Sequence, residues 1–305
     1  KYFLRAVGVF LKMSRIAYVN GQYVPHQDAA VHIEDRGYQF ADGVYEVFAV
    51  HQGRMVGEQG HMDRLAHSLG ELRIDWPMSA RALGVIIREV SRRNRVRDGL
   101  IYLQITRGVA RRDHSFPDNT ESALVVTARR MPPLDKEQLR KGVGVITIPD
   151  IRWQRHDIKS VSLLPNIIGK QQAREAGAYE AWMVNNEGMI TEGTASNAWI
   201  VTKDGELVTH NASHAILNGI TRLSVLEAAV AAGVPFFERA FSVEEAMQAK
   251  EAFVTSSTSH VKAVTSIDGH SIGNGHIGEL TSRMLDLYVD FIESMGGPQN
   301  TSTWN

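Results

Sequence analysis

Two adjacent prolines, Pro132 and Pro133, limit what this chain of 305 residues can fold into more than any other feature. Proline lacks a backbone N–H, so the charged segment RMPPLDK (130–136) cannot continue a strand and is typical of a linker. A chain of this length fits two domains better than one. We therefore predict an α+β protein with an N-terminal extension (1–12), a small first domain (13–130), a linker (131–136), a larger second domain (137–295) and a tail (296–305).

Both sides of the linker mix strand-like and helix-like patterns. Asn20-Gly21 between IAYV and QYV predicts a hairpin, because both residues tolerate positive φ. Ser79 is an N-cap candidate for a helix with Leu83, Ile86, Ile87 and Val90 on one face. Further strands are predicted at 44–50, 100–106, 123–128, 142–148, 180–184, 197–201 and 251–255, and helices at 167–176, 221–232, 243–250 and 277–292. This order does not alternate as a Rossmann sheet would, and no G-x-G-x-x-G or Walker A motif occurs.

Composition excludes several classes of function. A net charge of −1 gives no reason to expect nucleic acid or a charged membrane as partner. No cysteine is present, which excludes disulfides and thiolate sites and fits a reducing cytoplasm. The opening KYFLRAVGVFLK is basic and apolar, but its apolar stretch is too short for a signal peptide and lacks a small-residue cleavage site, while Met13 opens a more typical start. The histidines show no metal-binding spacing, so we expect no metal.

A lysine and a glutamate stand out for their chemistry. Lys159 precedes the apolar run VSLL; a lone lysine there usually keeps its ammonium in water, but it could also be a Schiff-base lysine that attacks an aldehyde. Glu192 lies among small residues in TEGTASN (191–197). Such a glutamate is usually solvated, yet one that faced a pyridine nitrogen would keep it protonated and make the ring an electron sink.

Two polar turns could bind anions. Gly219-Ile220-Thr221 opens an apolar helix, where free N–H groups and a hydroxyl suit a phosphate, although such a segment taken alone is more often a plain capping turn. The turn TSSTS (255–259) offers further hydroxyls or is a solvated loop. In the loop RRDH (111–114), Arg112 and His114 could clamp a carboxylate, because the arginine fork matches it in two hydrogen bonds. The alternative is a solvated charged turn.

Seven segments, in this order, resemble the fold-type IV pyridoxal-phosphate transaminases (class IV), and within them the D-amino acid aminotransferases. The resemblance runs from about Ile16 to about Ile292. The segments are EDRGYQFADGVYEV (34–47), HMDRL (61–65), RRDHSFP (111–117), DIRWQRHDIKS (150–160), TEGTASN (191–197), LNGITR (217–222) and FVTSSTS (253–259).

The resemblance implies two α/β domains with pyridoxal 5'-phosphate between them and a role for each matching residue. Lys159 would bond the cofactor and carry the proton, and Glu192 would face the pyridine nitrogen. Leu217 would pack under the ring. The phosphate would be held by Arg64, Gly219, Ile220, Thr221, Ser256 and Ser257. Tyr45, Arg112 and His114 would trap the substrate carboxylate, the last two in the partner subunit's site, which implies a homodimer.

The activity implied is ping-pong transamination between D-amino acids and 2-oxo acids, for example D-alanine and 2-oxoglutarate giving pyruvate and D-glutamate. The alternatives are a branched-chain L-amino acid or an R-selective amine transaminase of the same fold, or a cofactor-binding protein without turnover. Ser257 stands where a threonine is expected. His156 stands where a cysteine can occur, and it is assigned no role.

Overall fold

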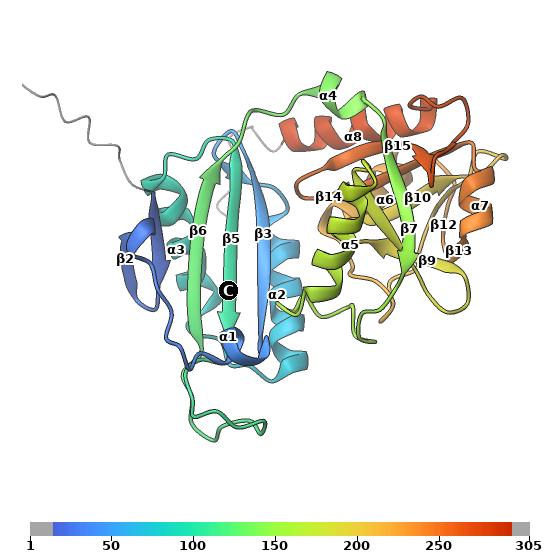
Figure 1. Cartoon of the computed structure of the whole chain (residues 1–305). Helices are drawn as coiled ribbons and strands as arrows, with labels where there is room; N and C mark the ends of the chain where they lie inside the picture. Colours follow the sequence, from blue (N-terminus) through green and yellow to red (C-terminus); the bar gives the residue numbers. More distant parts are fainter. Residues whose placement is uncertain (1–14, 295–305) are drawn as a thin grey trace, which may run out of the picture.

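A computed structural model describes residues 15–294 and forms two α+β units that lie side by side (Figure 1). The predicted extension (1–12) and tail (296–305) fall outside the described residues. The first unit contains a six-stranded sheet in the order β2-β1-β6-β5-β3-β4. Its strands are β1 (Ile16–Val19), β2 (Gln22–Pro25), β3 (Gly43–His51), β4 (Arg54–Met55), β5 (Gly99–Thr106) and β6 (Ala123–Arg130). Its helices are η1 (His26–Asp28), α1 (Arg36–Phe40), α2 (Glu58–Leu72) and α3 (Ala80–Arg93).

The local signals of the first unit act as predicted. Asn20 and Gly21 have φ of 42° and 93° and join β1 to β2. The Ser79 hydroxyl accepts from the N–H of Ala82 and caps α3. Leu83, Ile87 and Val90 are buried against the sheet, where each side chain contributes about 1.5–3 kcal/mol. Ile86 is only half-buried, so the buried face of α3 is narrower than predicted.

The second unit contains a ten-stranded sheet in which antiparallel and parallel pairs are mixed. Its order is β12-β11-β10-β14-β15-β7-β8-β9-β13, with β16 paired to β15. Strand β7 runs parallel to β8 and to β15, and most other pairs are antiparallel. The strands are β7 (Val143–Pro149), β8 (Glu180–Val184), β9 (Met189–Gly193), β10 (Asn197–Val201), β11 (Leu207–Thr209), β12 (Phe236–Glu238), β13 (Phe241–Ser242), β14 (Glu251–Ser256), β15 (His260–Ile267) and β16 (His270–Ser271).

The helices of this unit begin and end within a few residues of the predicted ranges. They are α5 (Leu164–Glu175), α6 (Ile220–Ala231), α7 (Val243–Gln248) and α8 (Glu279–Ser294). Strand β15 was not predicted, because Lys262 and Ser266 interrupt its apolar residues. It nevertheless occupies the middle of the sheet, between β14 and β7.

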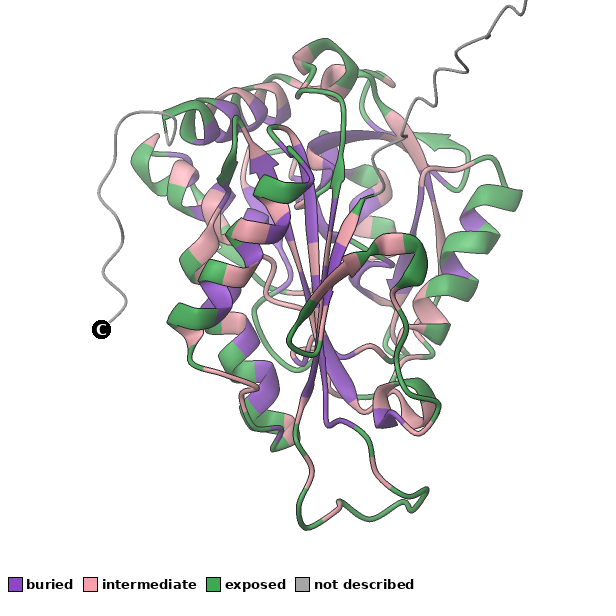
Figure 2. Ribbon diagram, turned by 90° about the vertical axis from the view of Figure 1, so that its left-hand side faces the viewer, coloured by how far each residue is buried: buried purple, intermediate pink, exposed green. Residues whose placement is uncertain are grey.

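An extended stretch containing both prolines connects the units and leads into α4 (Lys136–Arg140). Leu134 and Leu139 pack onto the core of the second unit, and Ala49 and Leu100 of the first sheet belong to that same core. The units are therefore joined by buried contacts as well as by the connecting chain. Buried strands occupy the centre of the molecule, while the loop between β5 and β6 projects from one end and is mostly exposed (Figure 2).

Candidate active site

Lys159 lies where the two units meet, on the loop between β7 and α5. Its carbonyl accepts from the N–H of Tyr45 at 3.0 Å, and its own N–H donates to the Ser68 hydroxyl at 3.1 Å. Because the N–H of Val161 also donates to the carbonyl of Gly43 at 3.0 Å, this loop runs along the edge of β3. The ammonium lies 4.3 Å from the centroid of the Tyr45 ring, which is a cation–π contact. The backbone of both units thus fixes the position of this amine.

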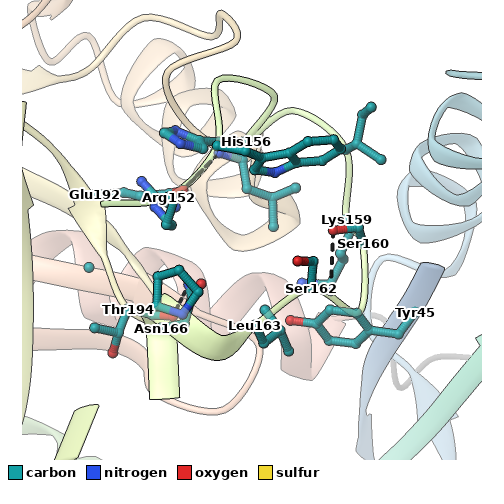
Figure 3. A pocket seen from close by; sticks show the side chains of 15 residues that line it. Tyr45, Arg152, His156, Lys159, Ser160, Ser162, Leu163, Asn166, Glu192 and Thr194 are labelled. Carbon is teal, nitrogen blue, oxygen red and sulfur yellow. Dashed lines mark hydrogen bonds and ion pairs between the residues drawn. The ribbon is translucent and has the colours of Figure 1, made fainter. Parts of the chain in front are cut away.

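Two adjoining cavities share Tyr45, Lys159, Glu192 and Leu217 as lining residues. The Trp153 cavity, of about 110 Å³, is also lined by Trp153, Arg152, His156, Ser162 and Asn166 (Figure 3). The Thr221 cavity, of about 200 Å³, is also lined by Arg64, Ser196, Asn197, Gly219, Ile220, Thr221 and Thr255–Thr258. Lys159 therefore borders both spaces.

Glu192, at the end of β9, is held by donors from several elements. Its Oε1 accepts from the Arg152 guanidinium at 2.6 Å, and its Oε2 accepts from the Asn197 amide at 3.1 Å. The N–H of Leu217 lies 3.1 Å from both oxygens. The side chain is 5% exposed, so these bonds fix a carboxylate that is almost withdrawn from water. The Glu192 carboxylate therefore has little freedom to move when a ligand enters.

Behind Glu192, Arg152 also pairs with Asp150. The Nε and Nη2 atoms of Arg152 lie 2.9 and 2.7 Å from the two Asp150 carboxylate oxygens, in the fork geometry that arginine favours. Burial alone would raise the pKa of Asp150, but the hydrogen bonds and charge of Arg152 outweigh it and lower the pKa to about 2. Burial likewise opposes the charge of Arg152, whose pKa is nevertheless raised by the two carboxylates. The charged state of this pair is therefore fixed.

Arg64, on α2, is positioned by a carboxylate of the first sheet. The Nε and Nη2 atoms of Arg64 donate to the two oxygens of Glu46 at 2.8 and 2.7 Å, and Nη1 donates to the carbonyl of Asn218 at 3.1 Å. His61 Nδ1 lies 2.7 Å from the same carboxylate, which is fully buried. Burial would raise the pKa of Glu46, but the charge and hydrogen bonds of Arg64 and His61 lower it to about 2. Burial lowers the pKa of His61 despite Glu46.

Helix α6 begins at the Thr221 cavity without a side-chain cap. Its N-cap residue is Gly219, and no side chain of the described residues accepts from its first turn. A Cβ on Gly219 would come within 2.1 Å of Asn197 Oδ1, so glycine allows this close approach. The open N–H groups and the helix dipole favour an anion at this position, with the Arg64 guanidinium beside it.

The hydroxyl-rich turn beside this helix is already partly committed. The Ser256 hydroxyl accepts from the N–H of Ser259 at 2.9 Å and of Thr258 at 3.3 Å, and so it closes the turn. The Thr255 hydroxyl accepts from the Trp199 indole at 2.9 Å. Both Ser256 and Ser257 line the Thr221 cavity. Within the described part of the chain, the Ser257 hydroxyl closes no turn in the way that the Ser256 hydroxyl does.

Arg112 and His114 lie apart from every other predicted site residue. They are exposed on the loop 107–122, which we call the arm, and they line neither cavity. The Arg112 guanidinium lies 4.6 Å from the centroid of the Phe40 ring, and the His114 ring lies 5.5 Å from it. Arg36 donates to the Asp113 carbonyl at 2.6 Å. The arm thus packs against α1, and the side chains of Arg112 and His114 remain exposed.

Comparison with known proteins identifies the family. The model of the amino-transferase class IV family matches residues 43–267. The D-alanine aminotransferase of Bacillus licheniformis is 42% identical over 87% of this chain and 93% of its own length. That of Listeria monocytogenes serotype 4b is 40% identical over 90% and 95%. The chain belongs to the class IV aminotransferases. Among solved structures, the branched-chain amino acid aminotransferase of Thermoproteus uzoniensis with norvaline has a TM-score of 0.80 at 25% identity, covering 93% of this chain and 96% of its own.

Several residues that hold the groups of this candidate site in place were not predicted from the sequence. They are Glu46, His61, Asp150, Arg152 and Asn197. Glu46 left one signal, since it is a lone acid within the apolar strand VYEVFAV and such acids are rarely buried without a partner. Arg152 lies in the quoted segment DIRWQRHDIKS, but nothing in its spacing indicates that it pairs with Glu192.

Residues 15–294 of the aminotransferase contain no helix that is long and apolar enough to cross a bilayer. Within the same range, no three His, Cys, Asp or Glu side chains are grouped so that they could hold a metal ion.

Proposed function

We propose that this aminotransferase uses pyridoxal 5'-phosphate to exchange amino groups between D-amino acids and 2-oxo acids. The single observation that carries the proposal is that Lys159 lines one cavity together with a buried carboxylate, Glu192, and an uncapped helix start at Ile220 and Thr221. The high identity to D-alanine aminotransferases supports the choice of substrate.

The donor set fits this cofactor at each of its polar ends. The phosphate would be held by Arg64, the N–H groups of Ile220 and Thr221 and the Ser257 hydroxyl, all of which line the Thr221 cavity. Glu192 would face the ring nitrogen, and Leu217 would pack against the ring. Lys159 would form the covalent bond. Each requirement is met by a group whose chemistry suits it: cation and N–H for phosphate, carboxylate for a protonated nitrogen, amine for an aldehyde.

The chain's own residues would perform the following tasks. When bound, pyridoxal phosphate supplies an aldehyde for the amino group and a ring that draws electrons from the substrate Cα. The Lys159 amine, fixed through its backbone to β3, would take the Cα proton on one face only. Glu192 would hold the ring nitrogen protonated, and Arg152 would keep that carboxylate in place. Tyr45 would stand beside the amine and contact the substrate carboxylate.

We further propose a homodimer in which Arg112 and His114 complete the partner subunit's site. In one chain these residues are exposed and outside both cavities, so a carboxylate trap within one chain would be incomplete. Exposed apolar residues on α5 next to the Trp153 cavity, Leu164, Ile167 and Ile168, suit an interface. The lack of cysteine suits a cytoplasmic enzyme.

The first experiment mixes the cofactor-loaded protein with D-alanine or with L-leucine in the absence of a 2-oxo acid. Loss of the cofactor's visible absorption band with D-alanine alone supports both the half-reaction and the choice of enantiomer. Loss with L-leucine alone would still support the proposed cofactor, but it would contradict the proposed role of Arg112 and His114 in selecting D-amino acids. A protein that binds the cofactor yet responds to neither donor nor to an R-amine would be a binder without turnover.

The shared site has its own test. Lys159→Ala and Arg112→Ala subunits are assayed alone and after mixed refolding, at low D-alanine concentration. If the arm acts across the interface, mixed dimers each contain one intact site, and about a quarter of the wild-type sites should be recovered at random pairing. No recovery, with mixed dimers shown to form, would place the arm in its own subunit's site.

A further inference from the structure

The middle of the arm is held to the first unit by arginines. Arg36 donates to the Asp113 carbonyl at 2.6 Å. The Arg107 guanidinium lies 3.7 Å from the centroid of the Phe116 ring, and the Arg73 guanidinium lies 5.0 Å from the same centroid. The arm projects from one end of the molecule (Figure 2), so these contacts decide where its exposed side chains lie.

One carboxylate orients two of these arginines. Arg36 Nε donates to Asp42 at 2.8 Å, and Arg107 donates to both Asp42 oxygens from Nε and Nη2 at 2.8 and 3.0 Å. Arg107 also donates to the carbonyls of Arg73 and Leu72, at the end of α2, each at 2.8 Å. Burial would raise the pKa of Asp42, but the hydrogen bonds and charges of the two arginines lower it. The Arg107 guanidinium is therefore fixed independently of the ring that it contacts.

The returning half of the arm has few packed side chains beneath it. It borders a cavity of about 600 Å³ that is lined by Arg73, Asp75, Arg107 and residues 116–122. Phe116 is 46% exposed and belongs to no core cluster. Pro117 disfavours a helical backbone at Phe116, so the direction of the ring is restricted by the chain itself. The contact with Arg107 is therefore the main side-chain anchor of this half of the arm.

Resting on the proposed function, we propose that Phe116 is a positioning residue for the carboxylate trap of Arg112 and His114. His114 lies two residues before Phe116 and Arg112 four, so the place of the ring sets the place of both. A guanidinium is attracted to the face of an aromatic ring, most strongly where it is withdrawn from water, and Arg107 is buried. Phe116 acts through the arm and touches no reacting group.

Two substitutions separate the aromatic face of Phe116 from its apolar volume. Phe116→Leu keeps an apolar side chain without the face, and Phe116→Tyr keeps the face. Trypsin cleaves after Arg111 and Arg112, and its rate follows the population of arms that have left their place. We expect the cofactor-loaded Phe116→Leu enzyme to be cleaved there about tenfold faster than the wild type, and Phe116→Tyr at the wild-type rate. Phe237→Leu, a similarly exposed phenylalanine on β12, is the matched control and should change nothing.

The kinetic consequence follows from the same population. A substrate is bound only where the trap is in place, so KM for D-alanine should rise about fivefold in Phe116→Leu while kcat stays unchanged. Phe116→Tyr should restore the wild-type KM. Urea unfolding should give the same midpoint for all of these variants, because the ring lies outside the core. A purely structural role would instead lower that midpoint and leave KM unchanged.

Arg112→Ala serves as the reference in these assays. Unchanged cleavage in Phe116→Leu would overturn the proposal, and so would faster cleavage with an unchanged KM when Arg112→Ala raises KM. If Arg112→Ala itself leaves KM for D-alanine unchanged, the proposed trap is wrong, and the cleavage rates alone decide whether Phe116 holds the arm. The failure of this inference and the failure of the proposed function are therefore distinguishable.

Discussion

The cofactor side and the arm of this molecule are built in opposite ways. On the cofactor side, two buried clusters, Glu46–His61–Arg64 and Asp150–Arg152–Glu192, hold their charged groups by several hydrogen bonds, and together we call them the buried charge network. On the arm, Arg112 and His114 are exposed and rest on a single ring, Phe40. If the proposed function holds, one chain is sufficient to position the cofactor, whereas substrate recognition needs contacts that only the proposed dimer would complete.

The difference has an energetic counterpart. Breaking a buried ion pair leaves an uncompensated charge and costs about 3–5 kcal/mol. Exposed cation–π contacts contribute about 0.5–1 kcal/mol each. Substitutions in the buried charge network should therefore reduce stability and cofactor binding together, while substitutions of Arg112 and His114 should affect substrate binding alone.

The largest effect is expected at Lys159, which borders both cavities. Lys159→Ala removes the proposed covalent bond and the proposed proton carrier, and a positioned general base alone contributes about 10²–10⁴-fold. We expect no measurable pyruvate from D-alanine and 2-oxoglutarate in a coupled assay, with the circular dichroism spectrum unchanged. Full activity in this variant would contradict the mechanism.

The next effect concerns the buried network. Glu46→Ala leaves Arg64 and His61 without their carboxylate, so we expect the free energy of unfolding to fall by about 3–5 kcal/mol. Cofactor affinity should fall with it, because Arg64 loses its orientation. Urea unfolding and equilibrium dialysis measure both. The control is Glu58→Ala, which breaks a partly exposed pair with Arg88 and should cost about 1 kcal/mol or less.

The same carboxylate predicts a pH dependence. The pKa of Glu46 is about 2 in the fold against an ordinary value of 4.5. A lowered pKa means that its stabilisation is fully present above about pH 4.5 and is lost as the pH falls towards 2. The wild type should therefore lose stability more steeply over this window than Glu46→Gln in urea unfolding series. Parallel curves would show that the Glu46 charge does not contribute.

On the arm, Arg112→Ala should leave stability unchanged and weaken the binding of carboxylate substrates. Loss of a charge-assisted pair costs about 1.5–3 kcal/mol, so KM for D-alanine should rise about 10- to 100-fold. R-amines without a carboxylate should be affected far less. Arg111→Ala, the exposed neighbour, is the matched control and should behave as the wild type. An equal loss on acids and amines would refute the clamp.

Local signals in the sequence predicted much of the fold, and the resemblance to a known family supplied the candidate site residues. The Asn20-Gly21 hairpin and the Ser79 cap act through their own backbone and side chain, so the sequence is sufficient to identify them. Lys159, Glu192 and the start of α6 lie in segments whose order resembles a known family. The structure brings all of these to one place.

What sequence could not reveal depends on contacts between distant residues. Glu46 and Arg64 are 18 residues apart, and Arg152 and Glu192 are 40 apart, so no local period links them. Ser256 was predicted as a cofactor ligand because it is a hydroxyl in the right turn, but its oxygen closes that turn. Its role towards the cofactor stays a prediction.

The smallest effect is expected from Phe40→Leu, a substitution that tests whether Phe40 positions the arm. Its ring lies 4.6 Å from the Arg112 guanidinium and 5.5 Å from the His114 ring, while Arg36 stands 4.9 Å away on the same ring. Phe40→Leu keeps an apolar side chain but removes the aromatic face, so we expect KM for D-alanine to rise about threefold to tenfold with kcat unchanged.

The control for this substitution is Tyr23→Leu, which removes a similar ring beneath Arg93 at 4.0 Å, far along the chain from the arm. It should leave KM unchanged. If Phe40→Leu lowered kcat instead, Phe40 would support the reacting groups rather than the arm. If neither parameter moved, the arm would be positioned by its backbone, through the Asp113 carbonyl and Arg36, and the contrast with the buried charge network would be smaller than the side chains indicate.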